Sequence, residues 1–277
     1  MSYWNDIYEH FNPIAFSIFG FKIHWYGIMY VSALLIGIYM AKWIIKKDKL
    51  PISQSEIDNY FIWIEIGVIL GARIGYLAFY QPNFIGYLTH PWDIFNPFEG
   101  GHFVGIRGMS FHGALIGFFI ASTLYSYKHK INQWFLLDIA AVAIPAGYIF
   151  GRIGNFLNQE LVGRETDVSW GIYVDGVLRH PSQLYEAFLE GFVVFIIMFL
   201  IRKRKKFHGE LISIYLILYG IARFSAEMFR APDVQIGYIY GGWMTKGQEF
   251  CLMMIGFGIF LYFYLKKYGK REIELSR

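Results

Sequence analysis

Long apolar stretches recur along this chain, and each one is bounded by polar or charged residues. A helix of about 20 apolar residues is long enough to cross the ~30 Å hydrocarbon core of a bilayer. Seven stretches approach that length, and we expect each of them to form a transmembrane helix. They occupy residues 25–45, 60–81, 110–125, 134–150, 184–201, 211–229 and 248–265.

A different pattern, in which apolar and polar positions alternate, precedes the first long stretch. Residues 14–25 alternate around Phe19 and Gly20. A period of two indicates a strand, and a glycine-containing turn between two such strands indicates a hairpin. We expect this hairpin to lie against the membrane surface with its Phe and Trp side chains.

A second hairpin is expected between the fourth and fifth apolar stretches. Residues 170–174 can pair with residues 177–179 across Asp175 and Gly176, which favour a two-residue turn. This hairpin would belong to a small outward-facing cap that covers about residues 155–183.

The overall composition indicates an integral membrane protein. The chain is 56% hydrophobic and 20% aromatic but only 17% charged, which is too apolar for a surface exposed to water. Its first residues lack the basic start and cleavage site of a removable signal peptide, so we expect the first stretch to remain as an anchor. Prolines and glycines within residues 81–108 predict irregular or interfacial structure. The sequence thus predicts an all-α polytopic membrane protein with one domain over residues 1–277.

The distribution of lysine and arginine predicts the orientation in the membrane. Sixteen of the 25 basic residues fall in blocks after the first, third, fifth and seventh stretches. The blocks are Lys42, Lys46, Lys47 and Lys49; Lys128 and Lys130; residues 202–206; and the tail from Lys266. The positive-inside rule assigns these blocks to the cytoplasm, so the N-terminus would lie outside and the C-terminus inside. Seven of the other nine basic residues are arginines, whose planar guanidinium binds phosphate or carboxylate at two points.

A run of polar residues occupies positions 151–163, where the fourth stretch reaches the predicted outer surface. It contains Arg152, Asn155 and Glu160. Polar groups at this depth cost free energy unless they are partnered. We interpret the run as a receptacle for an anionic headgroup.

The sixth stretch carries polar residues at the same predicted level. Tyr219, Arg223, Glu227 and Arg230 are spaced four, four and three residues apart, so they share one face of a helix. Other helices contribute polar side chains in the outer half. These are Arg73, His112 and Gln248, and we expect all of these residues to line one cavity.

Two arginines, Arg152 and Arg223, carry the functional interpretation. They can instead form simple ion pairs with Glu160 and Glu227. We favour an anion-binding role because two guanidinium groups that converge at one depth of a membrane usually serve a function.

For several other intramembrane residues a structural role is the simpler interpretation. Glu186 and Glu190 lie one helical turn apart, and we expect them to form helix–helix hydrogen bonds. Arg73 can equally pair with a neighbouring helix, because the small residues around it favour close packing. Asp138 is expected to have a structural partner, and Cys251 is expected to lie in the core.

His112 is the histidine predicted to lie inside a membrane span near the arginines. Imidazole has an unperturbed pKa near neutrality, which suits proton transfer. We expect His112 to act as a general base, and the alternative is a histidine that is only hydrogen-bonded.

Several motifs follow one another in a specific order. They are WYG at 25–27, GARIGY at 71–76, GMSFHG at 108–113, the run at 151–163, HPSQLYE at 180–186 and residues 219–233. In this set the chain resembles the prolipoprotein diacylglyceryl transferase family of bacteria across nearly its whole length. The family has a further glycine in the histidine motif where this chain has Ala114, which is larger by one methyl group.

The resemblance implies transfer of the sn-1,2-diacylglyceryl group from phosphatidylglycerol to the lipobox cysteine thiol of a prolipoprotein. Sn-glycerol 1-phosphate would be released, and this is the first step of bacterial lipoprotein maturation. The resemblance places the enzyme in the cytoplasmic (inner) membrane with its active site toward the periplasm. Phosphatidylglycerol would enter sideways from the outer leaflet, and the precursor would keep its signal helix in the membrane.

The resemblance also assigns roles to individual residues. It implies that Arg152 contacts the phosphatidylglycerol headgroup and that Arg223 is essential. The residues implied to position the substrates are Tyr26, Asn155, Glu160, Gly163, Tyr219 and Glu227. We expect no cofactor or metal, because the chain lacks a His-Glu-x-x-His pattern, a phosphate-binding glycine loop and a dinucleotide fingerprint.

A second class of protein remains possible from the residues alone. Seven spans and outward-facing arginines would also permit a transporter or receptor for an anionic lipid or solute. A transporter is expected to carry polar residues through both halves of the bilayer, or broken helices related by a repeat. In this chain the polar residues gather on one side, which favours the enzyme.

Overall fold

The computed structural model describes residues 3–81, 84–103, 108–231, 238–239 and 242–268. The chain divides into two compact units. One consists of Met1–Leu50 and Leu137–Arg277, and the other of Pro51–Leu136. The boundary falls in the first turn of a long helix, and both units are built mainly from helices of membrane length.

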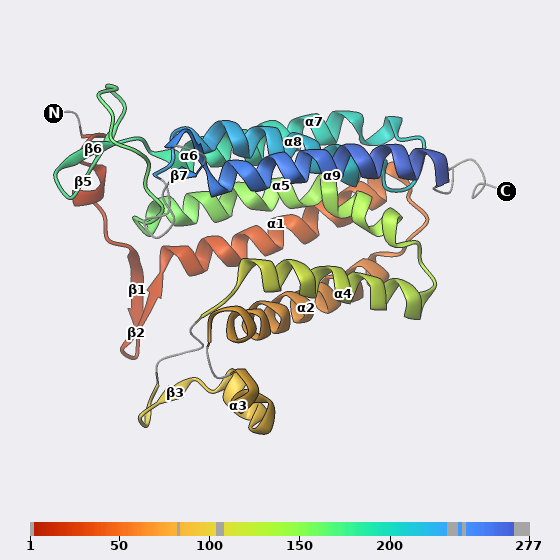
Figure 1. The fold of residues 1–277 in the computed structure, drawn as a ribbon, viewed down its shortest axis with the longest axis horizontal. Helices are drawn as coiled ribbons and strands as arrows, with labels where there is room; N and C mark the ends of the chain where they lie inside the picture. Colours follow the sequence, from red (N-terminus) through yellow and green to blue (C-terminus); the bar gives the residue numbers. More distant parts are fainter. Residues whose placement is uncertain (1–2, 82–83, 104–107, 232–237, 240–241, 269–277) are drawn as a thin grey trace. The chain divides into compact units, whose positions relative to one another are not determined.

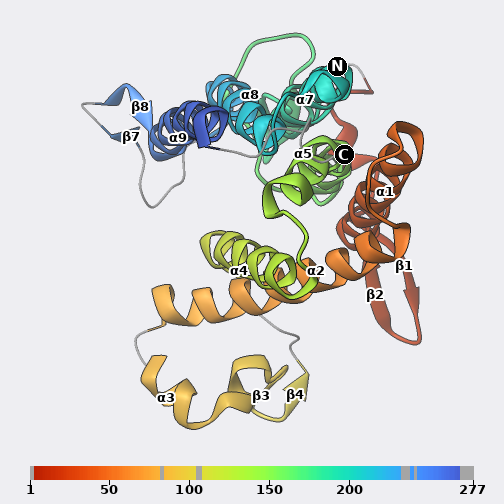
Figure 2. The ribbon, with the colours of Figure 1, turned by 90° about the vertical axis from the view of Figure 1, so that its right-hand side faces the viewer.

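The principal helices of the first unit run in the same general direction (Figure 1). They are α1 (Trp25–Asp48), α5 (Gln133–Leu157), α7 (Val194–Ile201), α8 (Glu210–Glu227) and α9 (Lys246–Tyr268). Figure 2 shows α7, α8 and α9 nearly end-on. Shorter elements of this unit are η1 (Ile7–Glu9), β1 (Ile14–Ile18), β2 (Phe21–His24), β5 (Ile172–Val174), β6 (Val177–Arg179), α6 (Ser182–Glu186), η3 (Ala187–Val193), η4 (Arg202–Arg204), β7 (Tyr238–Ile239) and β8 (Met244–Thr245).

The second unit is built on the helices α2 (Gln54–Tyr80) and α4 (Phe111–His129). Short elements lie between them along the chain, in the segment predicted to be irregular. They are α3 (Phe84–Thr89), η2 (Pro91–Phe95), β3 (Phe98–Glu99) and β4 (His102–Phe103). The described part of this segment is therefore more regular than its proline and glycine content predicts.

All seven predicted stretches coincide with helices. Within the described residues, five helical segments are long and apolar enough to cross a membrane, so the chain is a multi-pass membrane protein. They are Trp25–Asp48, Gln54–Tyr80, Gln133–Leu157, Ser182–Arg204 and Lys246–Tyr268. The other two stretches form α4 and α8, which are more polar; α8 carries Glu210, Arg223 and Glu227 within its 18 residues. Seven crossings therefore remain a prediction.

Local hydrogen bonds explain why one helix extends beyond its predicted start. The second apolar stretch begins at residue 60, but α2 starts immediately after Ser53. The Ser53 hydroxyl accepts from the backbone N–H of Glu56 at 3.1 Å, and the Glu56 carboxylate accepts from the backbone N–H of Ser53 at 2.8 Å. This capping box satisfies two N-terminal donors and so stabilises a polar first turn.

The fifth stretch forms one continuous helical run from α6 to α7, but its middle was not predicted correctly. Residues Ala187–Val193 form a π-helix, in which hydrogen bonds join residues five apart. Such wide turns are rare and occur frequently at functional sites. The apolar pattern of the sequence does not distinguish them from an ordinary α-helix.

Both predicted hairpins are confirmed. Strand β1 pairs with β2, and β5 pairs with β6, each in antiparallel register. Phe19 and Gly20 have φ values of 48° and 84°, and Asp175 and Gly176 have values of 51° and 77°. Two consecutive residues with positive φ form the type I′ turn, whose twist matches the twist of the flanking strands.

Glycines allow the helices of the first unit to approach one another closely. A Cβ atom on Gly147 of α5 would lie 2.5 Å from the carbonyl oxygen of Ala33 in α1. A Cβ atom on Gly191 of η3 would lie 2.6 Å from Cγ1 of Ile149 in α5. These contacts hold α5 firmly between α1 and the π-helical segment.

The second unit depends on the same device between α2 and α4. A Cβ atom on Gly71 would lie 2.3 Å from the carbonyl oxygen of Gly113, and one on Gly117 would lie 2.0 Å from the carbonyl oxygen of Gly67. The interpretation that small residues near Arg73 mediate close helix packing is therefore confirmed. Buried Arg73 itself donates hydrogen bonds to backbone carbonyls of the segment that follows α2.

A single methyl group at this contact is expected to destabilise the protein. Gly117→Ala should lower the free energy of unfolding by about 1–3 kcal/mol, because two backbones must separate to admit the new Cβ. Gly37→Ala in α1 is the matched control, since nothing lies within 4 Å of a Cβ there. Thermal unfolding of the purified protein in detergent measures both, and equal midpoints for the two variants would contradict the packing argument.

Candidate active site

Three polar side chains near the C-terminal end of α5 bind one another. The Arg152 guanidinium donates from Nε to the Tyr148 hydroxyl at 2.7 Å and from Nη1 to Oδ1 of Asn155 at 3.2 Å. Asn155 in turn donates from Nδ2 to Oε1 of Glu160 at 2.7 Å. The fourth apolar stretch was predicted to end at residue 150, whereas α5 continues to Leu157. Arg152 and Asn155 therefore sit on a rigid helix and not in a loop.

Helix α8 presents a second arginine from the predicted polar stripe. Nη1 of Arg223 lies 2.9 Å from Oε2 of Glu186 and 3.4 Å from Oε1 of Glu190, and its Nη2 lies 2.9 Å from Oε2 of Glu227. The Tyr219 hydroxyl, one turn earlier, donates to the Tyr148 hydroxyl at 3.4 Å. Three carboxylates thus fix both ends of the Arg223 guanidinium.

Glu186 connects the two arginines. Its Oε2 lies 2.9 Å from Nε of Arg152 and 2.9 Å from Nη1 of Arg223, and its Oε1 lies 3.6 Å from Nη1 of Arg230. The Glu186 side chain is fully buried, and among the described residues no donor is aligned for a hydrogen bond to either oxygen. Electrostatic attraction to three arginines is therefore what holds this carboxylate in place.

The expected helix–helix hydrogen bonds of Glu186 and Glu190 describe only part of their role. Glu190 accepts a short hydrogen bond from the Tyr148 hydroxyl, but both carboxylates lie among the arginines. One signal in the sequence could have identified them. Two carboxylates one turn apart in an apolar helix require nearby cations, because an uncompensated charge in the membrane is costly.

The cluster is balanced in charge, and Arg152 keeps a donor that is not paired within it. Its arginines are 152, 223 and 230, and its glutamates are 186, 190 and 227. Among the described residues, no acceptor is paired with Nη2 of Arg152, and this side chain is 16% exposed. The arrangement can therefore offer a fixed guanidinium N–H to an anion without a large excess of positive charge.

The polar run after α5 is held by the elements on either side of it. Gln183 donates to the carbonyl of Glu160 at 2.5 Å, and the Ser182 hydroxyl donates to the carbonyl of Leu161 at 3.1 Å. A Cβ atom on Gly163 would lie 2.4 Å from the carbonyl oxygen of His180. Only glycine fits there, so Gly163 is required for the close approach of two segments of the cap, one around Gly163 and one around His180.

His180 is held by contacts with Tyr185 and with the backbone of Arg164. Its Nδ1 lies 3.2 Å from the Tyr185 hydroxyl, and its backbone N–H donates to the carbonyl of Arg164 at 2.9 Å. Partial burial lowers the pKa of His180 below its usual value, although nearby Asp167 acts in the opposite direction. These contacts support a structural role.

Three other predicted site residues lie on α1, at the start of α9 and on α4. Tyr26 in the first turn of α1 packs beside α5, where a Cβ on Gly154 would lie 3.4 Å from the tyrosine ring. Gln248 caps α9 together with Thr245, whose hydroxyl donates to Glu227 at 3.1 Å. His112 is exposed in the first turn of α4, within the second unit, and its role as a base stays a prediction.

A family model for prolipoprotein diacylglyceryl transferase matches residues 13–264 of the chain. The chain belongs to this family. It is therefore a transferase of lipoprotein biosynthesis, and the transporter or receptor interpretation is set aside.

Close relatives cover the chain almost completely, and each carries the name phosphatidylglycerol–prolipoprotein diacylglyceryl transferase. The protein of Campylobacter curvus is 61% identical over 267 residues, which are 96% of this chain and 98% of the relative. The protein of Campylobacter lari is 60% identical over 270 residues, covering 98% and 99%. That of Wolinella succinogenes is 58% identical over 270 residues, again covering 98% and 99%.

Removal of the Glu186 charge is expected to destabilise the site. Glu186→Gln should lower the free energy of unfolding by about 3–5 kcal/mol, because three arginines would lose their shared buried partner. Glu165→Gln is the control, since the Glu165 side chain is 72% exposed in its ion pair with Arg179 and an exposed pair contributes about 0–1 kcal/mol. The midpoints of thermal unfolding in detergent are compared for the two variants. A Glu186→Gln midpoint as high as that of the control would show that the cluster does not depend on this carboxylate.

Proposed function

We propose that this chain transfers the sn-1,2-diacylglyceryl group from phosphatidylglycerol to the lipobox cysteine thiol of a prolipoprotein. The thiol sulfur forms a bond to a glycerol carbon, and the bond between that carbon and the phosphate oxygen breaks. The products are a thioether-linked lipid and sn-glycerol 1-phosphate, and the thiol proton must be removed. The observation that carries the proposal is the convergence of Arg152 and Arg223 on one buried carboxylate.

The chemistry requires stabilisation of the departing phosphate. Negative charge builds up on its oxygen as the carbon–oxygen bond breaks, and fixed guanidinium groups in a water-poor site stabilise such charge strongly. Arg223 is held by Glu186, Glu190 and Glu227, so it need not reorganise during the reaction. In this proposal the open Nη2 of Arg152 binds the headgroup of the donor lipid.

The balanced charge of the cluster supports turnover as well as binding. Phosphatidylglycerol carries one negative charge, and its released glycerol phosphate carries a larger negative charge near neutral pH. A site with a large positive excess would retain the more negative product. With Glu186, Glu190 and Glu227 close to the arginines, repulsion from the carboxylates favours release of that product.

The remaining site residues position the substrates in this proposal. Asn155 and Glu160 form a hydrogen-bonded pair beside Arg152, and Tyr26 packs against the same helix end. Tyr219 supports the Tyr148 hydroxyl, while Gly163 keeps its segment of the cap close to the segment around His180. Neither a cofactor nor a metal takes part.

The thiol needs activation, since a free cysteine has a pKa of about 8.5 and the thiolate is the nucleophile. We assign this step to His112 as a general base. The alternative is that the positive field of the arginines lowers the pKa of the thiol without a base.

The proposal includes a location and an orientation. Seven spans would cross the bacterial cytoplasmic membrane, with the N-terminus outside and the C-terminus in the cytoplasm. The cap of residues 155–183 and the arginine cluster would then face the periplasm. The basic blocks after alternate helices support this orientation. Phosphatidylglycerol enters from the outer leaflet, and the precursor stays anchored by its signal helix.

Loss of either arginine is expected to abolish most of the transfer. Purified protein, phosphatidylglycerol and a lipobox peptide are incubated together, and mass spectrometry detects the diacylglyceryl group on the cysteine. Arg152→Ala and Arg223→Ala should each lower the rate by about 100- to 1,000-fold or more, as loss of one charge-stabilising donor does in other enzymes. Arg204→Ala, which alters an exposed arginine of η4, should keep the wild-type rate. Normal transfer by either cluster variant would refute the proposed site.

The role of His112 is tested separately by the pH profile. His112→Gln should lower the rate by about 100-fold at neutral pH, and the loss should shrink as pH rises and the thiol ionises without a base. The same peptide assay provides the rates. Near-normal turnover of the variant across the pH range would exclude the general base and leave the transferase proposal intact.

A further inference from the structure

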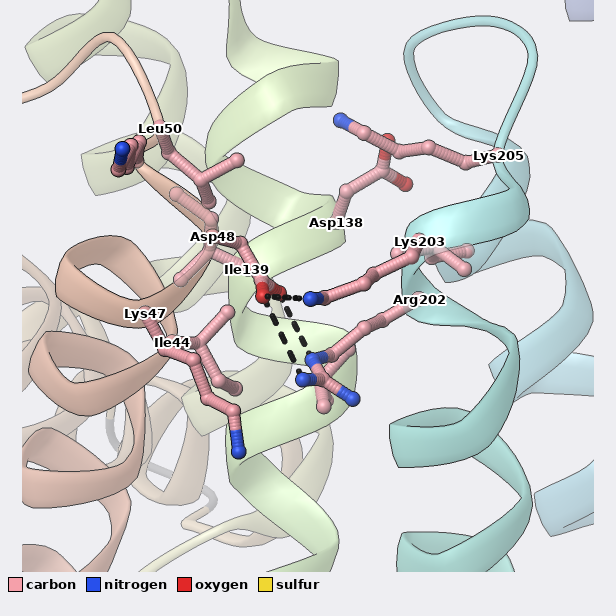
Figure 3. A pocket seen from close by; sticks show the side chains of 12 residues that line it. Ile44, Lys47, Asp48, Leu50, Asp138, Ile139, Arg202, Lys203 and Lys205 are labelled. Atoms are coloured by element: carbon pink, nitrogen blue, oxygen red, sulfur yellow. Dashed lines mark hydrogen bonds and ion pairs between the residues drawn. The ribbon is translucent and has the colours of Figure 1, made fainter.

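A second polar site lies at the opposite end of the same helices. Asp138 and Arg152 are both on α5, and a rise of about 1.5 Å per residue separates them by roughly 21 Å along the helix. A cavity of about 400 Å³ opens beside Asp138. The end of α1, the N-terminal half of α5, η4 with the residue that follows it, and the start of α8 line it (Figure 3).

The cavity carries an excess of positive charge. Five basic side chains line it, against the two carboxylates of Asp48 and Asp138. The basic residues are Lys47, Lys49, Arg202, Lys203 and Lys205. This excess of three contrasts with the balanced cluster at the other end, where each arginine has a glutamate partner.

The two carboxylates are already engaged by the protein. Asp48 lies 2.8 Å from Nε of Arg202 and 3.2 Å from Nζ of Lys203, and Figure 3 shows both side chains converging on it. Asp138 accepts from the backbone N–H groups of Gly209 at 2.8 Å and Ile212 at 3.0 Å, which confirms its structural role. The two carboxylates therefore hold together the segments that line the cavity. They do not neutralise Lys47 and Lys49.

Lys47 and Lys49 are the basic side chains of the lining that have no carboxylate partner among the described residues. Both are exposed. The Lys47 ammonium lies 4.1 Å from the centre of the Trp43 ring. It can give up this cation–π contact for a stronger attraction to an anion. An anion in the cavity would also lie near Arg202, whose side chain is only 8% exposed and is therefore fixed in place.

The floor of the cavity indicates what kind of anion fits. Ile44, Ile139, Val142 and Leu211 supply apolar side chains from membrane-length helices. A ligand that combines a phosphate with hydrocarbon could pair its phosphate with the basic side chains and pack its hydrocarbon against these apolar side chains. Basic pockets between helices at a membrane boundary are typical binding sites for anionic lipid headgroups.

We propose that this cavity binds the phosphate of an anionic glycerophospholipid in the membrane leaflet opposite to the arginine–glutamate cluster. Bound there, the lipid would hold together the end of α1, the N-terminal half of α5 and η4, which the repulsion among the basic side chains otherwise separates. The proposal concerns a site distinct from the transfer reaction, and it stands whether or not that reaction is as proposed.

The test counts lipids that remain bound to the full-length protein. Protein in nanodiscs of phosphatidylglycerol and phosphatidylcholine is released and weighed by native mass spectrometry. Lys47→Gln/Lys49→Gln should retain one phosphatidylglycerol fewer than the wild type and bind it about 30-fold more weakly, the factor expected for loss of two lysines from an anionic surface. Both lysines lack carboxylate partners among the described residues, so the fold should be preserved, and an unchanged thermal midpoint in detergent verifies this.

The matched control is Lys266→Gln/Lys267→Gln, which removes two exposed lysines from the end of α9 and leaves the cavity unchanged. It should retain as many phosphatidylglycerol molecules as the wild type. A large excess of inorganic phosphate should not displace the lipid from the wild type. Equal retention by the cavity variant, an equal loss in the control, or displacement by phosphate alone would each overturn the lipid site, and the last result would indicate a free-anion site instead.

Discussion

The site depends on one electrostatic constraint, which is that the buried carboxylate of Glu186 must be surrounded by cations. A charge removed from water at membrane depth is costly, and attraction to opposite charges offsets this cost only when the geometry is close. Arg152, Arg223 and Arg230 approach Glu186 from α5, α8 and the turn after α8. The ends of α5 and α8 are therefore coupled to each other and to α6, which carries Glu186.

The same constraint explains the unusual backbone of the fifth stretch. Glu186 precedes the π-helical turn and Glu190 lies within it, and both carboxylates meet Arg223. Gly191 brings this turn against α5, so the carboxylates and Arg152 belong to one rigid contact. Guanidinium groups held in this way keep their orientation while the charge of a substrate changes, which is the condition for electrostatic catalysis.

The two ends of the helices of the first unit use charge in different ways. Near Glu186 the cations and carboxylates are matched, so selectivity comes from the direction of individual N–H groups. Near Asp48 the cations exceed the carboxylates, so an anion is attracted by the net field. Each arrangement agrees with its proposed ligand, because a substrate must leave after the reaction whereas a lipid at a structural site can remain.

The sequence by itself determined the features that depend on neighbours along the chain. Membrane-length helices follow from apolar stretches, the two hairpins follow from alternation around Phe19-Gly20 and Asp175-Gly176, and the stripe from Tyr219 to Glu227 follows from helical spacing. The tertiary structure alone decided which charges meet. It paired Arg152 with Glu186 as well as joining Asn155 to Glu160, and it engaged Arg73 with backbone carbonyls. Periodicity specifies the face on which a side chain lies, but only the packing of helices distant in sequence specifies what that face contacts, because buried charges select partners by proximity in space.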